Sequence, residues 1–181
     1  GRILDMGCTV GNSTLPWAEA FPDAEVHAID VAAPCLRYGH ARAELAGVPV
    51  HFSQRNAECT GFDAESFDVV LSHIVIHETS KPALRNIIAE SYRLLKPGGV
   101  MLHLDVPRGS GPFDQFMSQW EVYNNNEVFA SHLTDIDLAA LAADCGFAGD
   151  KVSMVGVGPY TGINHAYNDH GFKWPTLLGT K

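Results

Sequence analysis

The opening stretch of this chain constrains its fold more than any other. Residues 2–6 are mostly apolar and predict a short buried strand. Gly7 and Gly11 follow, and glycine lets the backbone turn sharply and approach a ligand closely. Asn12 or Ser13 can then cap the helix that comes next. A strand, a glycine loop and a helix N-terminus in this order predict a site for a polar or anionic group.

A carboxylate stands at the end of the second predicted strand. Residues 25–29 predict this strand, and Asp30 follows it, nineteen residues after Gly11. An acid at about that distance, at the tip of the second strand of a βαβ unit, is placed to bind the hydroxyls of a ribose. We therefore expect Asp30 to face the same ligand as the glycine loop.

This pattern resembles the first motif of the class I S-adenosylmethionine-dependent methyltransferases. The motif reads Asp-x-Gly-x-x-x-Gly and is matched by Asp5, Gly7 and Gly11. On this motif alone, the alternative is another Rossmann-type nucleotide-binding protein. The dehydrogenase fingerprint Gly-x-Gly-x-x-Gly does not start at Gly7, which favours the methyltransferase resemblance.

Later segments resemble the same family in order and spacing. Residues 67–72 begin with Phe-Asp and continue as an apolar run, as expected of a central parallel strand. In the family such a strand ends beneath the methyl donor. Residues 93–99 read Arg-Leu-Leu-Lys-Pro-Gly-Gly before a predicted strand at 100–105, which resembles the family's next helix, turn and strand. Helical patterns at 33–46 and 82–95 complete the alternation of strands and helices.

The resemblance and this alternation imply an α/β fold of the Rossmann-like, doubly wound type. We expect a seven-stranded, mostly parallel sheet whose last strand, at 177–180, is antiparallel. Residues 48–52 and 151–155 supply two further predicted strands. We expect residues 1–181 to form a single S-adenosylmethionine-dependent methyltransferase domain that lacks the N-terminal helical cap common in the family.

The resemblance implies S-adenosylmethionine as the cofactor and S-adenosylhomocysteine as its product. The glycine loop should meet the amino-acid end, Asp30 the ribose and residues 56–58 the adenine. The family often has Asp-Ala-Glu at this last place, whereas this chain has Asn-Ala-Glu; the Asn56 carbonyl oxygen can still accept a hydrogen bond from the adenine amino group. The alternative is an ordinary polar loop. The expected cofactor-binding residues are Asp5, Gly7, Cys8, Thr9, Gly11, Asp30, Val31, Asn56, Ala57, Glu58, Ser72 and His73.

His77 is the candidate catalytic residue. It follows the fourth predicted strand, and ligands bind beyond the carboxyl ends of strands in open α/β sheets. A hydroxyl or acidic-carbon acceptor needs a base, and neutral imidazole suits that task near neutral pH. Glu78, Asp105 or Glu121 could orient the second imidazole nitrogen. The alternative is a histidine that only shapes the pocket. His73 and His77 lack the His-Glu-x-x-His order of zinc proteases, so we predict no metal site.

Charge and composition narrow the class of partner. The formal net charge is -9, from 21 acidic and 12 basic residues, which argues against binding nucleic acid through its phosphates. No apolar run approaches the ~20 residues that a membrane helix needs. The four cysteines form no Cys-x-x-Cys pair and predict reduced thiols in a cytoplasmic protein. We therefore expect a small-molecule substrate, no nucleic acid and no membrane. The sequence leaves the oligomeric state open.

Three classes of function remain. The leading one is transfer of a methyl group to an oxygen, nitrogen or carbon of a small organic metabolite. A protein or RNA methyltransferase is second, although residues 72–75 do not match the Asn/Asp-Pro-Pro-Tyr of amide-methylating members. A non-catalytic S-adenosylmethionine-binding module is third.

The remaining stretches carry weaker predictions. An aromatic helix predicted at 112–123 either walls a substrate pocket or packs on the core. Residues 134–137 predict a capping box for the next helix, and residues 156–173 predict a long loop.

Overall fold

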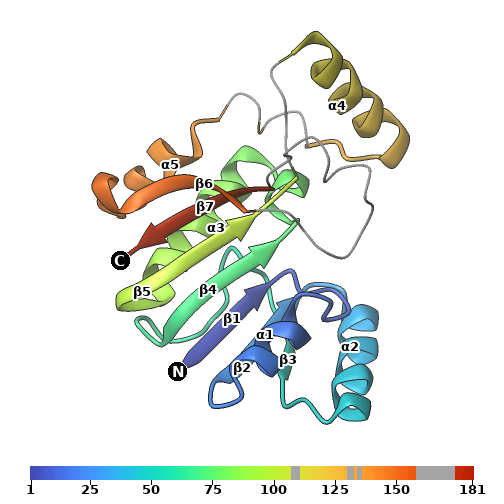
Figure 1. The fold of residues 1–181 in the computed structure, drawn as a ribbon, viewed down its shortest axis with the longest axis vertical. Helices are drawn as coiled ribbons and strands as arrows, with labels where there is room; N and C mark the ends of the chain where they lie inside the picture. Colours follow the sequence, from blue (N-terminus) through green and yellow to red (C-terminus); the bar gives the residue numbers. More distant parts are fainter. Residues whose placement is uncertain (107–110, 130–132, 134–135, 158–173) are drawn as a thin grey trace.

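The protein is built on one seven-stranded sheet with the strand order β3-β2-β1-β4-β5-β7-β6 (Figure 1). The computed structural model describes residues 1–106, 111–129, 133, 136–157 and 174–181. The strands are β1 (Arg2–Met6), β2 (Glu25–Asp30), β3 (His51–Gln54), β4 (Phe67–His73), β5 (Leu95–Leu104), β6 (Val152–Val157) and β7 (Trp174–Thr180). Strand β7 runs antiparallel to both β5 and β6, and the other pairings are parallel. The predicted fold is therefore confirmed, including the central place of β1 beside β4.

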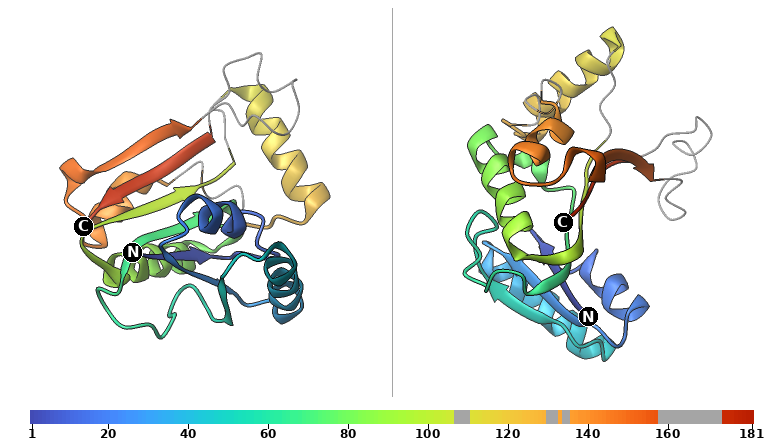
Figure 2. Two further views of the ribbon diagram at one scale, coloured as in Figure 1. Left: turned by 60° about the horizontal axis from the view of Figure 1, so that its bottom comes forward. Right: turned by 90° about the vertical axis from the view of Figure 1, so that its left-hand side faces the viewer.

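Helices cover both faces of the sheet. The helices of the described residues are α1 (Thr14–Ala20), α2 (Ala33–Ala46), α3 (Lys81–Leu94), α4 (Pro112–Asn125) and α5 (Leu138–Asp144), with short 3-10 helices η1 (Ile76–Glu78) and η3 (Gly149–Lys151); all but α4 lie against the sheet or its edges. Figure 2 shows α1 and α3 on opposite sides of the sheet. This arrangement buries both faces of the central strands, as expected of a largely parallel sheet.

The alternation of side chains along β1 supplies both apolar layers. Ile3 packs in the cluster that includes Ala18 of α1. Leu4 and Met6 belong to the larger cluster on the other face, together with Ile88 of α3. Because successive side chains of a strand point to opposite faces, one short segment is fixed from both sides. The carboxyl end of β1 is thereby held in place, and the glycine loop starts there.

Some boundaries differ from those that the sequence predicts. The third strand is predicted at 48–52 but pairs with β2 only from its His51 end, since Pro49 has no backbone N–H to contribute to a ladder. Helix α5 is capped by Asp137, whose side chain accepts the N–H three residues later at 3.0 Å. Thr134, the expected cap, lies outside the described residues, as do residues 158–173 of the predicted loop.

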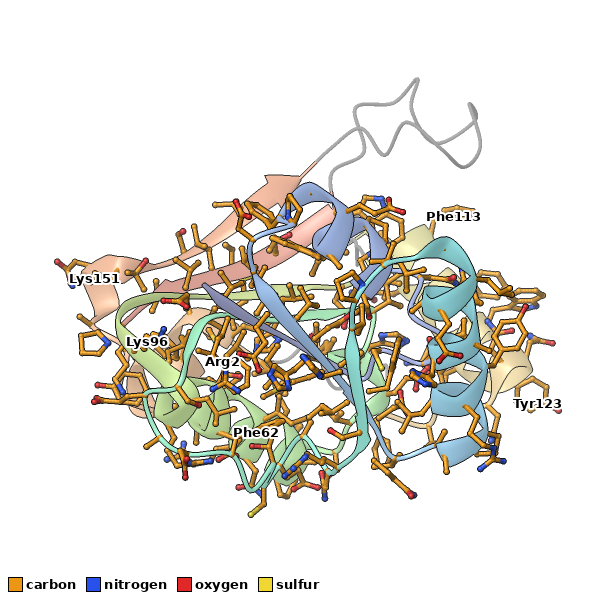
Figure 3. All side chains as sticks on the ribbon, turned by 90° about the horizontal axis from the view of Figure 1, so that it is seen from below. Arg2, Phe62, Lys96, Phe113, Tyr123 and Lys151 are labelled. Atoms are coloured by element: carbon orange, nitrogen blue, oxygen red, sulfur yellow. The ribbon has the colours of Figure 1, made fainter. Side chains whose placement is uncertain are left out.

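Helix α4 extends away from the sheet (Figures 1 and 2). Four aromatic side chains at three- and four-residue spacing are exposed on it: Phe113, Phe116, Trp120 and Tyr123. Figure 3 shows Phe113 and Tyr123 at the outer margin of the molecule. These rings do not pack into the described core, so the packing-helix hypothesis is not supported, and a pocket wall stays a prediction. Within the described residues, no helix is long and apolar enough to cross a membrane.

Candidate functional site

The glycine loop after β1 is held tightly against its neighbours. Gly7 and Gly11 both have positive φ, at 74° and 78°, a conformation that favours glycine. The Gly7 N–H donates to the Ile29 carbonyl of β2 at 2.8 Å. A Cβ on Gly7 would lie 2.7 Å from Val75, and one on Gly11 would lie 2.8 Å from Leu15. Both glycines are therefore favoured by backbone angle, and a larger residue at either position would force Val75 or Leu15 to shift.

Two β-branched residues at this edge of the sheet also adopt positive φ. Thr9 in the glycine loop has φ 45°, and Ile74 just after β4 has φ 59°. Left-handed backbone is unfavourable for side chains branched at Cβ. Strain of this kind gathers at functional sites, where surrounding structure imposes it. No sequence pattern marks Ile74, whereas Thr9 lies inside the recognised motif.

Asp5 is a buried carboxylate beneath the loop. Its Oδ2 accepts the hydroxyls of Ser13 at 2.7 Å and Thr14 at 2.6 Å. Its Oδ1 is buried without a hydrogen-bond partner among the described residues. Burial raises the pKa of Asp5 to about 6, although the two hydroxyls lower it and the charge of Asp30 adds to the rise. Ser13 precedes α1 as expected, but its hydroxyl binds Asp5 instead of capping the helix.

Asp30 joins the loop to β2. Its Oδ2 accepts the Thr9 N–H at 2.9 Å, and its Oδ1 accepts the Ala32 N–H at 2.8 Å. A carboxylate has about four acceptor positions, so each oxygen can still accept a hydroxyl. Asp30 is 9% exposed, and Val31 beside it is 65% exposed. The exposed Val31 side chain thus offers an apolar surface for a ring, and the adjacent Asp30 carboxylate offers acceptors for the ring's hydroxyls.

Residues 56–58 follow β3 at the same edge of the sheet. The Asn56 Oδ1 accepts the Glu58 N–H at 2.9 Å, which closes a local turn. The Glu58 carboxylate accepts the Asn86 side chain of α3 at 2.8 Å. Asn56 is exposed and its carbonyl oxygen has a second lone pair, so it remains able to accept a ligand amino group.

Ser72, near the end of β4, directs its hydroxyl into the interior. It bonds His103 Nδ1 at 2.8 Å, and Ser91 bonds His103 Nε2 at 3.2 Å. The Ser91 hydroxyl donates to the Ile87 carbonyl, so it accepts the Nε2–H, and Nδ1 accepts from Ser72. Burial lowers the pKa of His103 to about 4, against an opposing effect of Asp105. His103 is therefore neutral, and the Ser72 hydroxyl is occupied.

His77 forms a buried pair with Asp105. The Nδ1–Oδ1 distance is 2.7 Å, and Asp105 Oδ2 also accepts the His77 backbone N–H at 3.1 Å. Burial lowers the pKa of His77, but hydrogen bonding and charge from Asp105 outweigh it, and the net pKa is raised. The Nδ1 proton faces Asp105, so Nε2 is the nitrogen available for proton transfer. His77 is 2% exposed, with Nε2 3.9 Å from the largely exposed carboxylate of Glu78.

His73 ends β4 and is half-buried. Burial lowers its pKa, against an opposing effect of the Asp105 charge. Within the described residues, no group of three or more His, Cys, Asp or Glu side chains is arranged to hold a metal ion. His73 and His77 thus differ in the direction of their pKa shifts, lowered for His73 and raised for His77.

A family model described as "Methyltransferase domain" matches residues 3–99, from β1 into β5. The matched region contains the glycine loop, Asp30, residues 56–58 and His77. The chain belongs to this family. The recognised resemblance is confirmed, and the shared region carries the candidate site except for Asp105.

Curated relatives of this methyltransferase-family chain include two enzymes with named substrates. It is 29% identical over 123 residues to a malonyl-[acyl-carrier protein] O-methyltransferase of Salmonella typhimurium, covering 68% of this chain and 45% of that protein. It is 33% identical over 106 residues to a demethylmenaquinone methyltransferase of Thermus thermophilus, covering 59% and 47%. The chain thus spans about half the length of these relatives.

Solved structures agree with the fold along almost the whole chain. The YcgJ protein of Bacillus subtilis aligns with a TM-score of 0.72 and 18% identity, covering 99% of this chain and 91% of that one. A Haemonchus contortus phosphoethanolamine N-methyltransferase 2 in complex with S-adenosyl-L-methionine aligns with a TM-score of 0.71 and 18% identity, covering 99% and 48%. At these identities the likeness concerns the fold.

The structure gathers the expected site residues at one edge of the sheet. Residues 5–11, 30–31 and 56–58 lie at the carboxyl ends of the adjacent strands β1, β2 and β3, and residues 72–77 lie at the end of β4. Cys8 is buried, and burial raises the pKa of its thiol. Ala57 is partly buried against the main core.

Sequence reasoning missed several supporting residues. Ser13 and Thr14 were not recognised as partners of Asp5, nor Val75 as the neighbour of Gly7. Arg42 of α2 also donates to the loop carbonyl of Val10 at 2.7 Å. A hydroxyl pair directly after the motif is a usable signal for the first two. No local sequence pattern indicates the roles of Val75 and Arg42.

Proposed function

We propose that this chain is the donor-binding and catalytic region of an S-adenosylmethionine-dependent methyltransferase that acts on a small organic acceptor. The observation that carries the proposal is the meeting, at one edge of the sheet, of a strained glycine loop, Asp30 and the Asp105–His77 pair. The acidic charge and the small acceptors named for curated relatives support a small molecule. Four free cysteines fit a cytoplasmic location, where thiols stay reduced.

The donor site uses groups that the fold leaves available. The unpartnered, buried Oδ1 of Asp5 is an acceptor for the ammonium group at the amino-acid end of the donor. Asp30 accepts the ribose hydroxyls through its remaining lone pairs, and Val31 supplies apolar surface beside them. Residues 56–58 receive the adenine. When bound, S-adenosylmethionine supplies an electrophilic methyl group on its sulfonium.

His77 is the proposed general base. Asp105 holds the Nδ1 proton, so the imidazole keeps a lone pair at Nε2 for the acceptor proton. In the described conformation the ring is 2% exposed, and the exposed Glu78 carboxylate approaches Nε2 to 3.9 Å. The acceptor therefore reaches Nε2 only if the side chains or segments that cover the ring move.

Transfer of a labelled methyl group tests the function class. The protein is incubated with methyl-labelled S-adenosylmethionine and pooled small metabolites, and in parallel with protein and RNA fractions. We expect label in the low-mass fraction together with S-adenosylhomocysteine. Label in protein or RNA would establish the macromolecular alternative. Donor binding by calorimetry without any turnover would establish the non-catalytic module.

His77→Asn tests the base, with the exposed His40→Asn as a matched control. Turnover should fall about 10²- to 10⁴-fold in the first variant while donor affinity is unchanged. Asp105 raises the pKa of His77, so the pH–rate inflection should move to lower pH in Asp105→Asn. A higher KM for the acceptor with unchanged turnover at saturation would make His77 a shaping residue instead.

A further inference from the structure

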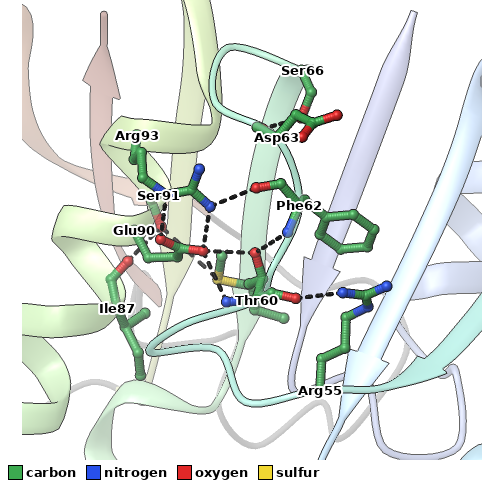
Figure 4. Close-up of polar contacts among 10 residues, drawn as sticks. Arg55, Thr60, Phe62, Asp63, Ser66, Ile87, Glu90, Ser91 and Arg93 are labelled. Atoms are coloured by element: carbon green, nitrogen blue, oxygen red, sulfur yellow. Dashed lines mark hydrogen bonds and ion pairs between the residues drawn. The ribbon is translucent and has the colours of Figure 1, made fainter.

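Glu90 of α3 is a buried carboxylate that the proposed chemistry does not use. Its Oε1 accepts both the backbone N–H of Thr60 at 2.8 Å and the Thr60 hydroxyl at 2.6 Å. Thr60 is itself buried, and its carbonyl accepts Arg55 Nη1 at 2.6 Å. Figure 4 shows these contacts joining α3 to the loop between β3 and β4. The bond partners lie thirty residues apart in sequence.

Arg93 completes the network one helical turn along α3. Its Nε donates to Glu90 Oε2 at 2.7 Å, and its Nη2 donates to Glu90 Oε1 at 2.8 Å and to the Phe62 carbonyl at 2.7 Å. Burial raises the pKa of Glu90, but the hydrogen bonds from Arg93 and Thr60 outweigh it, and the net pKa is lowered. Glu90 is therefore ionised and fully engaged at neutral pH.

The same face of α3 makes a second bond to the loop. Asn86, one turn before Glu90, donates to the Glu58 carboxylate at 2.8 Å. Backbone bonds tie this loop to the rest of the protein at its two ends: Arg55 donates to the Asp30 carbonyl, and Glu65 and Ser66 donate to the carbonyls of residues 93 and 94. Between these ends, the strand-type pairing is an isolated bridge between Asn56 and Cys59. The middle of the loop is thus held largely by side chains of α3 and by Arg55.

Glu90 is the buried member of this ion pair, since its side chain is 8% exposed and that of Arg93 is 40% exposed. Burying a charge rarely stabilises a protein more than an apolar side chain of the same volume would. Geometry is the stronger reason to keep it, because Glu90 Oε1 fixes both donors of Thr60 on the loop, while Arg93 of α3 holds Oε2 in place. The fixed donor at Thr60 lies only two residues beyond Glu58. A shift there is transmitted to residues 56–58 along a short, tightly turned backbone.

We propose that Glu90, through Thr60, is a positioning residue for adenine: it fixes residues 56–58 at the distance and orientation needed to recognise the amino-bearing edge of the base. The inference rests on the proposed assignment of residues 56–58 to adenine. It adds that this recognition depends on α3, a helix outside the donor site. Loosening the network should cost selectivity for adenine more than affinity for the rest of the donor.

The test compares two product analogues in calorimetry. S-adenosylhomocysteine carries the 6-amino group of adenine, and S-inosylhomocysteine replaces it with a carbonyl. The unsubstituted protein should prefer the first by about tenfold or more, because a mismatched donor–acceptor pair leaves buried groups unpaired. In Thr60→Val and Glu90→Gln, the preference should fall to about twofold, while the inosyl compound binds within about threefold of its original affinity.

Two control variants and one stability measurement guard the interpretation. Thr60→Ser keeps the hydroxyl and should keep the preference. Lys96→Met removes the Lys96–Asp68 ion pair of 2.8 Å, which lies at the N-terminal ends of β4 and β5, away from the proposed donor site. This change should leave the affinity for both analogues unchanged. Thermal unfolding of each variant identifies any that fail to fold. Thr60→Val is the milder change and serves if Glu90→Gln does not fold.

Equal weakening of both analogues in Thr60→Val would overturn the proposal, since that pattern indicates general loosening. A preference that survives in Thr60→Val and Glu90→Gln would overturn it as well, while leaving the adenine subsite intact. Absence of any preference in the unsubstituted protein would remove the adenine assignment. Absence of S-adenosylhomocysteine binding altogether would overturn the proposed function itself, and with it this inference.

Discussion

The buried carboxylate of Asp5 gives the sharpest test of the site. Removing its charge by Asp5→Asn keeps the size of the side chain and its acceptor for the Ser13 and Thr14 hydroxyls. The new amide NH₂ takes the place of the unpartnered Oδ1, and a buried unpaired donor costs about 1–3 kcal/mol. That cost does not depend on pH. The effect of removing the charge does depend on pH, because Asp5 is ionised only at higher pH. Measurements over a range of pH therefore separate the two effects.

The magnitude follows from the pKa of Asp5. Burial raises this pKa from 3.8 to about 6. The folded protein therefore favours the protonated form of Asp5 over the ionised form by about 3 kcal/mol more than the unfolded chain does. The folded protein binds this proton more tightly than the unfolded chain does. Its contribution to stability is therefore complete below pH 3.8 and is lost as the pH rises to about 6. The Asp5→Asn variant has no carboxyl group at this position, so its free energy of unfolding does not fall in this way as the pH rises.

Urea unfolding followed by tryptophan fluorescence measures the effect between about pH 4 and pH 7.5. The free energy of unfolding of the variant, relative to the unsubstituted protein, should rise by about 2–3 kcal/mol across that range. Asp23→Asn is the control, because Asp23 is an exposed carboxylate in the turn between α1 and β2, and its profile should follow that of the unsubstituted protein.

Parallel pH profiles for Asp5→Asn and the unsubstituted protein would refute the reasoning, because they would show that Asp5 titrates alike in the folded and unfolded chain.

A second consequence of the raised Asp5 pKa concerns ligand binding. If the donor ammonium pairs with Oδ1, binding of S-adenosylhomocysteine near pH 6 should release a proton. Calorimetry in buffers of different ionisation enthalpy detects that proton, and it should be absent in Asp5→Asn.

Three further predictions concern the same edge of the sheet and its surroundings. Asp30→Ala should weaken S-adenosylhomocysteine binding about ten- to a hundredfold, from the loss of charge-assisted hydrogen bonds; unchanged affinity in calorimetry would remove Asp30 from the site. Thr9→Gly should raise the free energy of unfolding by about 1 kcal/mol, since φ 45° is strained for threonine but not for glycine; a lower value would mean that the Thr9 side chain stabilises the loop. Gel-shift titrations at moderate salt should show no tight RNA or DNA binding at net charge -9, and micromolar, salt-sensitive binding would contradict this.

Local patterns in the sequence were sufficient for the architecture. Apolar runs, glycine turns and helical periodicity predict the strands and helices, and the resemblance supplies their order. Boundaries shifted where a local rule decided them: β3 starts beyond Pro49, and α5 begins at its own cap, Asp137. The clustering of the glycine loop, Asp30 and residues 56–58 also followed, since parallel strands bring their carboxyl ends to one edge.

The sequence alone therefore determined the fold, and it pointed to the stretches of the proposed donor site and to His77 as a candidate. Which acid pairs with His77 depended on strand register: His73 of β4 aligns with Leu104 of β5, so Asp105 reaches His77, while Glu78 is 3.9 Å from the other nitrogen. The unpartnered oxygen of Asp5 and the bond from Glu90 to Thr60 likewise depend on packing between distant segments. Periodicity encodes which face of an element is buried, but not which distant side chain meets it there. Only the tertiary structure decides that.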